Sequence, residues 1–125
     1  MKELTKEWID KAEGDFIVVN HEYDAKTPVY DAICFHAQQC VEKYMKAILQ
    51  ENNIKFEKVH DLDLLLEKCK HFAPLLEERK EELIELSSFA VEIRYPGITA
   101  AEEEAANCIS IMAGTRKIIK EYFEE

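Results

Sequence analysis

Hydrophobic residues recur at helical spacing along nearly the whole chain. In residues 3–23, Trp8, Ala12 and Phe16 follow one another by four positions, which places them on one face of an α-helix. The same kind of period appears in four further segments, residues 29–51, 62–69, 74–93 and 99 to the end of the chain. No segment shows a convincing strand pattern, so the chain is predicted to be all-α.

Helix-breaking and capping residues separate these segments. Asp61 is predicted to cap the third helix, and Pro74 fits the first turn of the fourth, where a missing N–H does no harm. Residues 94–97 end the fourth helix, and Thr99 with Glu102 three positions later matches a capping box for the last helix. Short connections between long helices favour antiparallel neighbours. The sequence therefore predicts one domain, an up-and-down antiparallel bundle of four to five helices.

The connection at residues 52–60 carries apolar residues without helical spacing. Ile54, Phe56 and Val59 are interleaved with lysines, a pattern that suits either a short extended stretch or a loop. The simpler interpretation is a loop whose apolar side chains close one end of the bundle.

Composition and charge narrow the range of functions. Of the 125 residues, 47% are hydrophobic and 34% are charged, which is typical of a folded globular domain. Acidic residues outnumber basic residues by 26 to 16, so the formal net charge is −10. A protein that coats nucleic acid without sequence preference needs an excess of cations, so this class is disfavoured, although a local basic patch is still allowed.

Several features point to the cytoplasm. The first residues are charged and lack the apolar stretch of a signal peptide, and no apolar run approaches the ~18 residues that would span a membrane. The four cysteines form no CxxC pair and lie among apolar residues; they are Cys34, Cys40, Cys69 and Cys108. They are interpreted as buried free thiols rather than as disulfides or metal ligands. We therefore predict a cytoplasmic protein.

Residues that commonly carry metal or phosphate chemistry lack the required spacing. The four histidines include no HxxxH or HExxH pair, so no zinc site is predicted; they are His21, His36, His60 and His71. The three glycines are isolated, which disfavours a glycine-rich phosphate loop. Runs of glutamate are interpreted as solvated helix faces. The sequence accordingly predicts neither a metal ion nor a cofactor.

Two positions are less ordinary. Arg94 is one of three arginines and lies among apolar residues at a helix end, where Tyr95 follows it. Its guanidinium suits two-pronged binding of a phosphate or carboxylate, or alternatively binding to the last carbonyls of its own helix. His60 and Asp61 stand at the head of a helix, where an exposed N-terminus can receive an anion, although a plain N-cap also explains Asp61.

A second, mixed stripe runs along residues 29–51. Its members are Phe35, Gln38, Gln39, Glu42 and Lys46. An aromatic ring beside amides and charges suits either a solvated face or contact with another subunit, where the amides can pair across the interface. Both interpretations stay open on the sequence alone.

Four stretches occur in an order that carries a family resemblance. They are WIDKAEGDF, FHAQQCVEKYMKAIL, VHDLDLLLEKC and EIRYPG. Together, over residues 5–123, they resemble the HEPN domain family (higher eukaryotes and prokaryotes nucleotide-binding), in its stand-alone bacterial or archaeal form. Residues 1–125 are thus identified as a single HEPN-like domain. The resemblance implies a compact helical bundle that commonly forms homodimers, and a separately encoded minimal nucleotidyltransferase as partner, the two often acting as toxin and antitoxin.

The resemblance also implies a ribonuclease motif that is missing here. Several HEPN proteins are metal-independent ribonucleases with an Arg-x4–6-His motif, whose two side chains meet at the dimer cleft. After Arg94 the corresponding residues 99–101 are Thr-Ala-Ala, and the other arginines are likewise not followed by histidine. No catalytic residue is therefore assigned, and whether the protein is an enzyme stays open. His36 or His60 can replace the missing base only if folding brings one of them to Arg94.

These observations favour a HEPN-like homodimer that binds a nucleotide or serves as partner subunit of a nucleotidyltransferase. The ligand-binding residues predicted on this basis are Arg94, Tyr95, His60, Asp61, Lys43 and Lys46. Arg94 would meet phosphate, Tyr95 would stack or hydrogen-bond, and the lysines would add positive potential. The predicted dimer interface comprises Phe35, Gln38, Gln39 and Glu42. The alternatives are a ribonuclease toxin with a displaced histidine and a noncatalytic structural dimer; RNA binding stays open, and no membrane partner is predicted.

Overall fold

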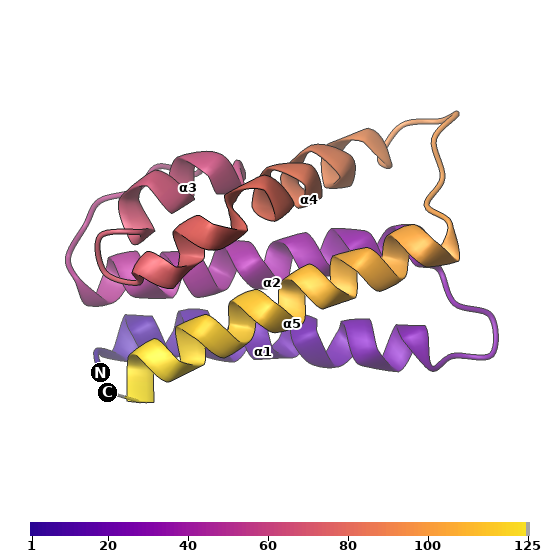
Figure 1. Ribbon diagram of the computed structural model, residues 1–125. Helices are drawn as coiled ribbons and strands as arrows, with labels where there is room; N and C mark the ends of the chain where they lie inside the picture. The colour runs from indigo at the N-terminus through magenta and orange to yellow at the C-terminus, as the bar shows by residue number, and fades with distance from the viewer. Residues whose placement is uncertain (125) are drawn as a thin grey trace.

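A computed structural model describes residues 1–124 as a bundle of helices, with no strand in that range (Figure 1). Its elements are α1 (Glu3–Tyr23), α2 (Tyr30–Glu51), α3 (Leu62–Cys69), the 3₁₀ helix η1 (Pro74–Arg79), α4 (Lys80–Glu92) and α5 (Glu102–Glu124). The predicted all-α bundle is confirmed. The single helix predicted over residues 74–93 is divided, however, because its first 6 residues form η1 before α4 begins.

The directions of the long helices follow from hydrogen bonds between their ends. α1 and α2 are antiparallel, since the Thr5 hydroxyl near the start of α1 donates to Glu51 at the end of α2 (3.0 Å). α2 and α5 run in the same direction, since the backbone N–H of Ala100, just before α5, donates to Asp31 in the first turn of α2 (2.7 Å). α3 is a short addition that lies with α4 on the side of α2 opposite α1 (Figure 1).

The core of the bundle is built around α2. This helix contacts α1, α3, α4 and α5, and α5 crosses in front of it in Figure 1. Ile33, Val41 and Ile48 mark its buried length, each with 0% of its surface exposed. A fully buried aliphatic side chain contributes about 1.5–3 kcal/mol relative to an exposed one. A helix buried along most of its length therefore anchors the others around it.

The connection between α2 and α3 is a loop that packs onto the bundle. Ile54, Phe56 and Val59 are partly buried against the core, which confirms the simpler interpretation of this stretch. Phe56 meets Trp8 edge-on, with ring centroids 5.9 Å apart. The apolar loop residues thereby fix the path of the chain that delivers His60 to the start of α3.

Two predicted caps have different outcomes. Asp61 caps α3 as predicted, because its carboxylate accepts the backbone N–H two residues further on (3.1 Å). The capping box predicted from Thr99 and Glu102 is wrong. The helix begins only at Glu102, and the capping carboxylate is that of Glu104, which accepts the backbone N–H of Ala101 (2.8 Å). A glutamate carboxylate still caps the start of the helix, but it belongs to the third residue of a run of three glutamates rather than to the first.

Candidate functional site

A groove of about 580 Å³ lies between the start of α3 and the C-terminal half of α4. Its walls include His60 and Asp61, which precede α3, and Arg94, which follows α4. The backbone N–H of Leu62 donates to the Ser87 hydroxyl (3.2 Å) and so ties the first turn of α3 to α4. The structure thus brings together the two positions that the sequence singled out separately.

His60 is oriented by a buried carboxylate beneath it. Its Nδ1 lies 3.1 and 3.2 Å from the two carboxylate oxygens of Glu42. Gln38 fastens both residues, since its Nε2 donates to the His60 carbonyl (2.7 Å) and to Glu42 (3.3 Å). The side chain of His60 is 65% exposed, whereas that of Glu42 is 4% exposed. An imidazole that donates Nδ1–H to a carboxylate keeps its other nitrogen, Nε2, for a ligand or a proton.

Glu42 is buried together with a charged partner from its own helix. The Nζ of Lys46, one turn further along α2, lies 2.9 Å from Glu42. The Lys46 ammonium also lies over the rings of Trp8 and Phe56, at 5.5 and 5.8 Å from their centroids. Lys46 was expected to add positive potential for a ligand, but it lies inside the protein, where Glu42 balances its charge. We call Gln38, Glu42, Lys46 and His60 the Glu42 cluster.

The mixed stripe of α2 consequently differs from both interpretations of the sequence. Its central members Gln38 and Glu42 are 3% exposed, because the loop of residues 52–60 covers them within the same chain. They are neither solvated nor open to a second subunit. Phe35 and Gln39 are half-buried, and for these two a place in a dimer interface stays a prediction.

Arg94 lines the groove after the end of α4. Its guanidinium carbon is 5.0 Å from the centre of the Phe35 ring, a cation–π contact that holds the side chain. Within residues 1–124 the guanidinium forms no hydrogen bond or ion pair, so it does not bind the last carbonyls of α4. Its donors therefore have no partner among the described residues.

Two other residues predicted to bind a ligand lie away from the groove lining. Tyr95 follows Arg94 and is 64% exposed, but it is outside the walls of the groove. Lys43 lies on another face of α2, where its Nζ contacts Asp15 of α1 at 2.6 Å. Asp15 also binds His36, whose Nδ1 is 2.9 Å away. His36 is thus engaged on the α1 side, and His60 is the histidine that lines the same groove as Arg94.

The groove also contains acceptors that the sequence did not single out. The Oδ1 of Asp63, on the first turn of α3, is buried and has no hydrogen-bond partner among residues 1–124. A buried polar atom of this kind needs a partner. Asp61 is already used as the cap of α3, so the helix N-terminus is closed by its own side chain.

A second charged cluster joins α1, α2 and α5. Its centre is Glu13, which accepts hydrogen bonds from Tyr44 (2.5 Å) and Arg116 (3.0 Å) and contacts Lys120 (2.9 Å). Burial raises the pKa of Glu13, but these hydrogen bonds outweigh it, and the pKa is lowered from 4.5 overall. Burial, and then Glu13, raise the pKa of Tyr44. We call these four residues the Glu13 cluster.

The sequence held one signal for polar packing on this side of α2. Asp15 lies on the apolar stripe of the first helix, between Ala12 and Phe16, where a carboxylate is out of place unless it has a partner. The structure shows it buried, at 8% exposure. The identity of its partners, and the neighbouring Glu13 cluster, depend on helix packing that the pattern alone does not define.

The fold and the site together define a class of protein, a helical bundle with a charged groove beside its fourth helix. The HEPN domain model matches residues 5–122, so the chain belongs to the HEPN domain family. The crystal structure of ST0689, an archaeal HEPN homologue, is similar with a TM-score of 0.72 and 24% identity, over 96% of this chain and 97% of that one. No curated protein matches. Among residues 1–124, no helix is long and apolar enough to cross a membrane.

Proposed function

We propose that this HEPN protein binds a nucleotide in the groove between His60 and Arg94, as the partner subunit of a minimal nucleotidyltransferase. The observation that most supports the proposal is the presence of an exposed guanidinium and a carboxylate-oriented imidazole in one groove. A guanidinium presents paired N–H donors that match phosphate oxygens, and an imidazole can add a further donor.

The rest of the groove suits the uncharged parts of a nucleotide. Asp63 also lines the groove, and its carboxylate can accept a hydrogen bond from a ribose hydroxyl or a base N–H. Ile84 and Val91 also line the groove and are 41% and 52% exposed, so they offer apolar surface to a base or to a second subunit. In the proposed homodimer, Phe35 and Gln39 contribute to the contact between the two subunits, beside these apolar residues.

Nucleotide binding is tested by titrating the purified protein with ATP and measuring the heat of binding. The Arg94→Ala variant is expected to bind at least about tenfold more weakly, because a charge-assisted hydrogen bond contributes about 1.5–3 kcal/mol. Arg79→Ala is the matched control, since Arg79 pairs with Glu82 (3.0 Å) outside the groove. Its affinity should stay within about twofold of the native protein. Equal affinity of the native and Arg94→Ala proteins, at equal stability, would contradict the assignment of the groove.

The partner and the dimer require separate measurements. Affinity purification of the protein from its own cells, followed by mass spectrometry, is expected to recover a small nucleotidyltransferase in stoichiometric amount. Sedimentation analysis is expected to show a dimer that Phe35→Asp weakens, because a charge would enter the proposed contact. The matched control is Leu4→Asp, which changes an exposed apolar residue of α1. Recovery of the chain alone, as a monomer, would contradict both parts.

One observation favours a second candidate, a ribonuclease with a displaced histidine. His60, which is oriented by Glu42, lines the same groove as Arg94, and this supports the displaced-histidine alternative. In such a reaction His60 Nε2 would accept the proton of the ribose 2′-hydroxyl. The oxygen would attack phosphorus, and Arg94 would stabilise the phosphorane. The 5′ oxygen would leave with a proton from the His60 imidazolium or from water, so the products would be a 2′,3′-cyclic phosphate and a 5′-hydroxyl end.

Cleavage of RNA by the purified protein in the presence of a chelator tests this candidate. His60→Ala and Arg94→Ala are expected to abolish the cyclic-phosphate product, whereas His71→Ala, which changes another exposed histidine, should leave it intact. Intact RNA over a wide range of protein concentration would exclude the candidate. Cleavage that survives both groove substitutions would assign the activity to a contaminant.

A further inference from the structure

The groove carries more negative than positive charge as long as His60 is neutral. Three carboxylates line it, those of Asp61, Asp63 and Glu92, whereas Arg94 is the one permanent cation among its lining residues in the described part of the chain. A phosphate group that enters the groove therefore meets one guanidinium against three carboxylates. Protonation of His60 would add a second positive charge at the place where an anion needs it.

The structure determines which nitrogen of His60 takes up that proton. Nδ1 lies 3.1 and 3.2 Å from the two carboxylate oxygens of Glu42. An ionised carboxylate accepts hydrogen bonds and donates none, so Nδ1 carries a hydrogen whether the imidazole is neutral or charged. Nε2 has no hydrogen-bond partner within residues 1–124. The proton gained on acidification therefore lies on Nε2 and changes this atom from an acceptor into a donor.

The charges beneath the imidazole balance each other. On the α2 side, Glu42 and Lys46 form an ion pair (2.9 Å). Gln38 adds no charge, and its amide fixes the His60 carbonyl at 2.7 Å. On the loop side, Lys58 precedes His60 by two residues but is exposed and does not line the groove. The unbalanced charges that face the imidazole are therefore those of the groove itself.

We propose that the groove binds a phosphate-bearing nucleotide together with a proton, which His60 takes up from solvent at Nε2. The inference rests on the proposed nucleotide site and adds its regulation. The protonated Nε2 donates a charge-assisted hydrogen bond to a phosphate oxygen, while Arg94 supplies the other cation. Histidine side chains change charge between about pH 5 and 8. The affinity for nucleotide therefore rises as the pH falls from 8 to 6 and is lost as the pH rises again.

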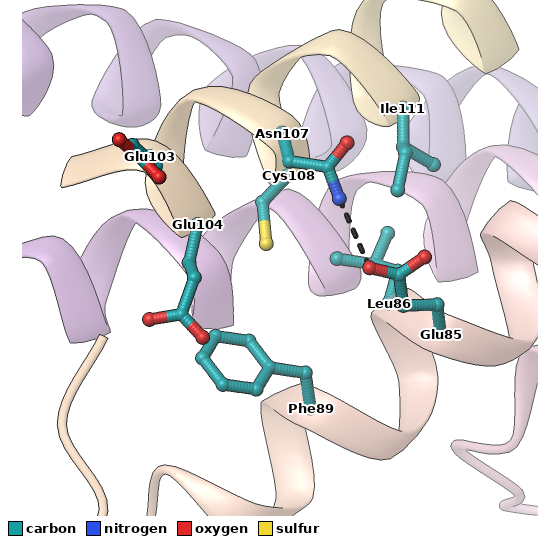
Figure 2. A pocket seen from close by; sticks show the side chains of 8 residues that line it. All are labelled: Glu85, Leu86, Phe89, Glu103, Glu104, Asn107, Cys108 and Ile111. Carbon is teal, nitrogen blue, oxygen red and sulfur yellow. Dashed lines mark hydrogen bonds between the residues drawn. The ribbon is translucent and has the colours of Figure 1, made fainter. Parts of the chain in front are cut away.

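A smaller pocket between α4 and α5 serves as an internal comparison. It has a volume of about 190 Å³, and its walls include Glu85, Glu103 and Glu104 (Figure 2). Asn107 donates to Glu85 (3.2 Å), and no arginine, lysine or histidine of residues 1–124 lines this pocket. Carboxylates ordinarily stay ionised between pH 6 and 8. Acidification over that range gives this pocket no positive charge, so a phosphate is expected to avoid it throughout.

The test is calorimetric titration with ATP at pH 7 in PIPES and in Tris, two buffers with different heats of ionisation. The difference between the two observed heats gives the number of protons taken up for each ATP bound. The terminal phosphate of a nucleotide also titrates near pH 6, so a variant must supply the baseline. His60→Asn serves this purpose, because the amide can still donate to Glu42 but does not titrate.

The native protein is expected to take up at least about 0.3 more protons for each ATP than His60→Asn does. Its affinity relative to that of the variant should increase at least about fivefold between pH 8 and pH 6. His71→Asn is the matched control, since it removes another exposed histidine outside the groove and changes the overall charge in the same way. This control should behave like the native protein in both measurements.

Nitrogen NMR of the imidazole in the native protein gives a readout that depends on neither the variant nor the ligand. Neutral His60 is expected to carry its hydrogen on Nδ1, and a hydrogen on Nε2 instead would overturn the inference. Equal proton uptake by the native and His60→Asn proteins would also overturn it, but would leave the nucleotide site in place. Failure of ATP to bind at any pH from 6 to 8 would overturn the proposed function and this inference together.

Discussion

Glu13 and Glu42 are the centres of two charged clusters on different faces of α2, and the clusters differ in what they leave exposed. Glu13 is bound by Tyr44, Arg116 and Lys120, partners that come from two other helices. Glu42 is bound by Lys46 and Gln38 inside the protein, but its third partner is His60, whose side chain is 65% exposed.

The difference separates a structural role from a functional one. The partners of Glu13 connect α1, α2 and α5, and each binds the Glu13 carboxylate. The buried carboxylate of Glu42 instead holds the exposed imidazole of His60 in one orientation, in the groove that Arg94 also lines. Burying a carboxylate is unfavourable unless it is paired and hydrogen-bonded. Both clusters meet that condition, but only the Glu42 cluster leaves a titratable group facing a groove.

Breaking the Glu42 cluster is expected to have the largest effect on stability. Glu42→Ala would leave the Lys46 ammonium buried without its partner, and removing one member of a buried pair typically costs about 3–5 kcal/mol. The measurement is the free energy of unfolding in urea. The double variant Glu42→Ala with Lys46→Met is the control, because it removes the stranded charge and should recover much of the loss. A single variant as stable as the native protein would show that Lys46 reaches solvent and that the pair is not truly buried.

Breaking the Glu13 cluster is expected to have an intermediate effect that depends on pH. Glu13→Gln should cost about 1–2 kcal/mol at pH 7, because it removes a charge that accepts several hydrogen bonds. The lowered pKa of Glu13 in the folded state means that its ionised form stabilises the fold fully above pH 4.5, its ordinary value. That contribution is lost as the pH falls below 4.5 and through the folded-state pKa.

Urea unfolding of the native and Glu13→Gln proteins, at a series of pH values from neutral to acid, checks this dependence. The difference in stability should shrink as the medium becomes acidic. Glu7→Gln, a change at an exposed position of the same helix, should shift stability by less than about 0.5 kcal/mol at every pH. A difference between the native and Glu13→Gln proteins that stays constant with pH would mean that the hydrogen bonds, and not the charge of Glu13, carry the effect.

The two clusters and the groove show which features of the molecule can be predicted from the sequence alone. The helical spacing of apolar residues predicts the five helices, because burial of one face is a local property of each segment. Arg94 and His60 were recognisable as unusual, since each stands at a helix boundary. Their meeting in one groove was not predictable, because it depends on the loop of residues 52–60 folding back along α2. Lys43 and Lys46 are predicted to bind a ligand, yet each pairs with a buried carboxylate. The long side chain of a lysine can reach such a carboxylate from the surface of its helix, and the spacing of residues along the sequence does not show which carboxylate lies within reach.

Substitution of Arg94 is expected to have the smallest effect on stability and the largest effect on binding. Its guanidinium contacts the Phe35 ring at 5.0 Å and has no polar partner in residues 1–124, so Arg94→Ala should cost no more than about 1 kcal/mol in urea unfolding. Phe35→Leu is the matched variant, since it removes the ring and keeps the charge. It should loosen Arg94 and weaken ATP binding less than Arg94→Ala does. A loss of stability from Arg94→Ala as large as that from Glu13→Gln would give Arg94 a structural role and contradict its assignment as a ligand-binding residue.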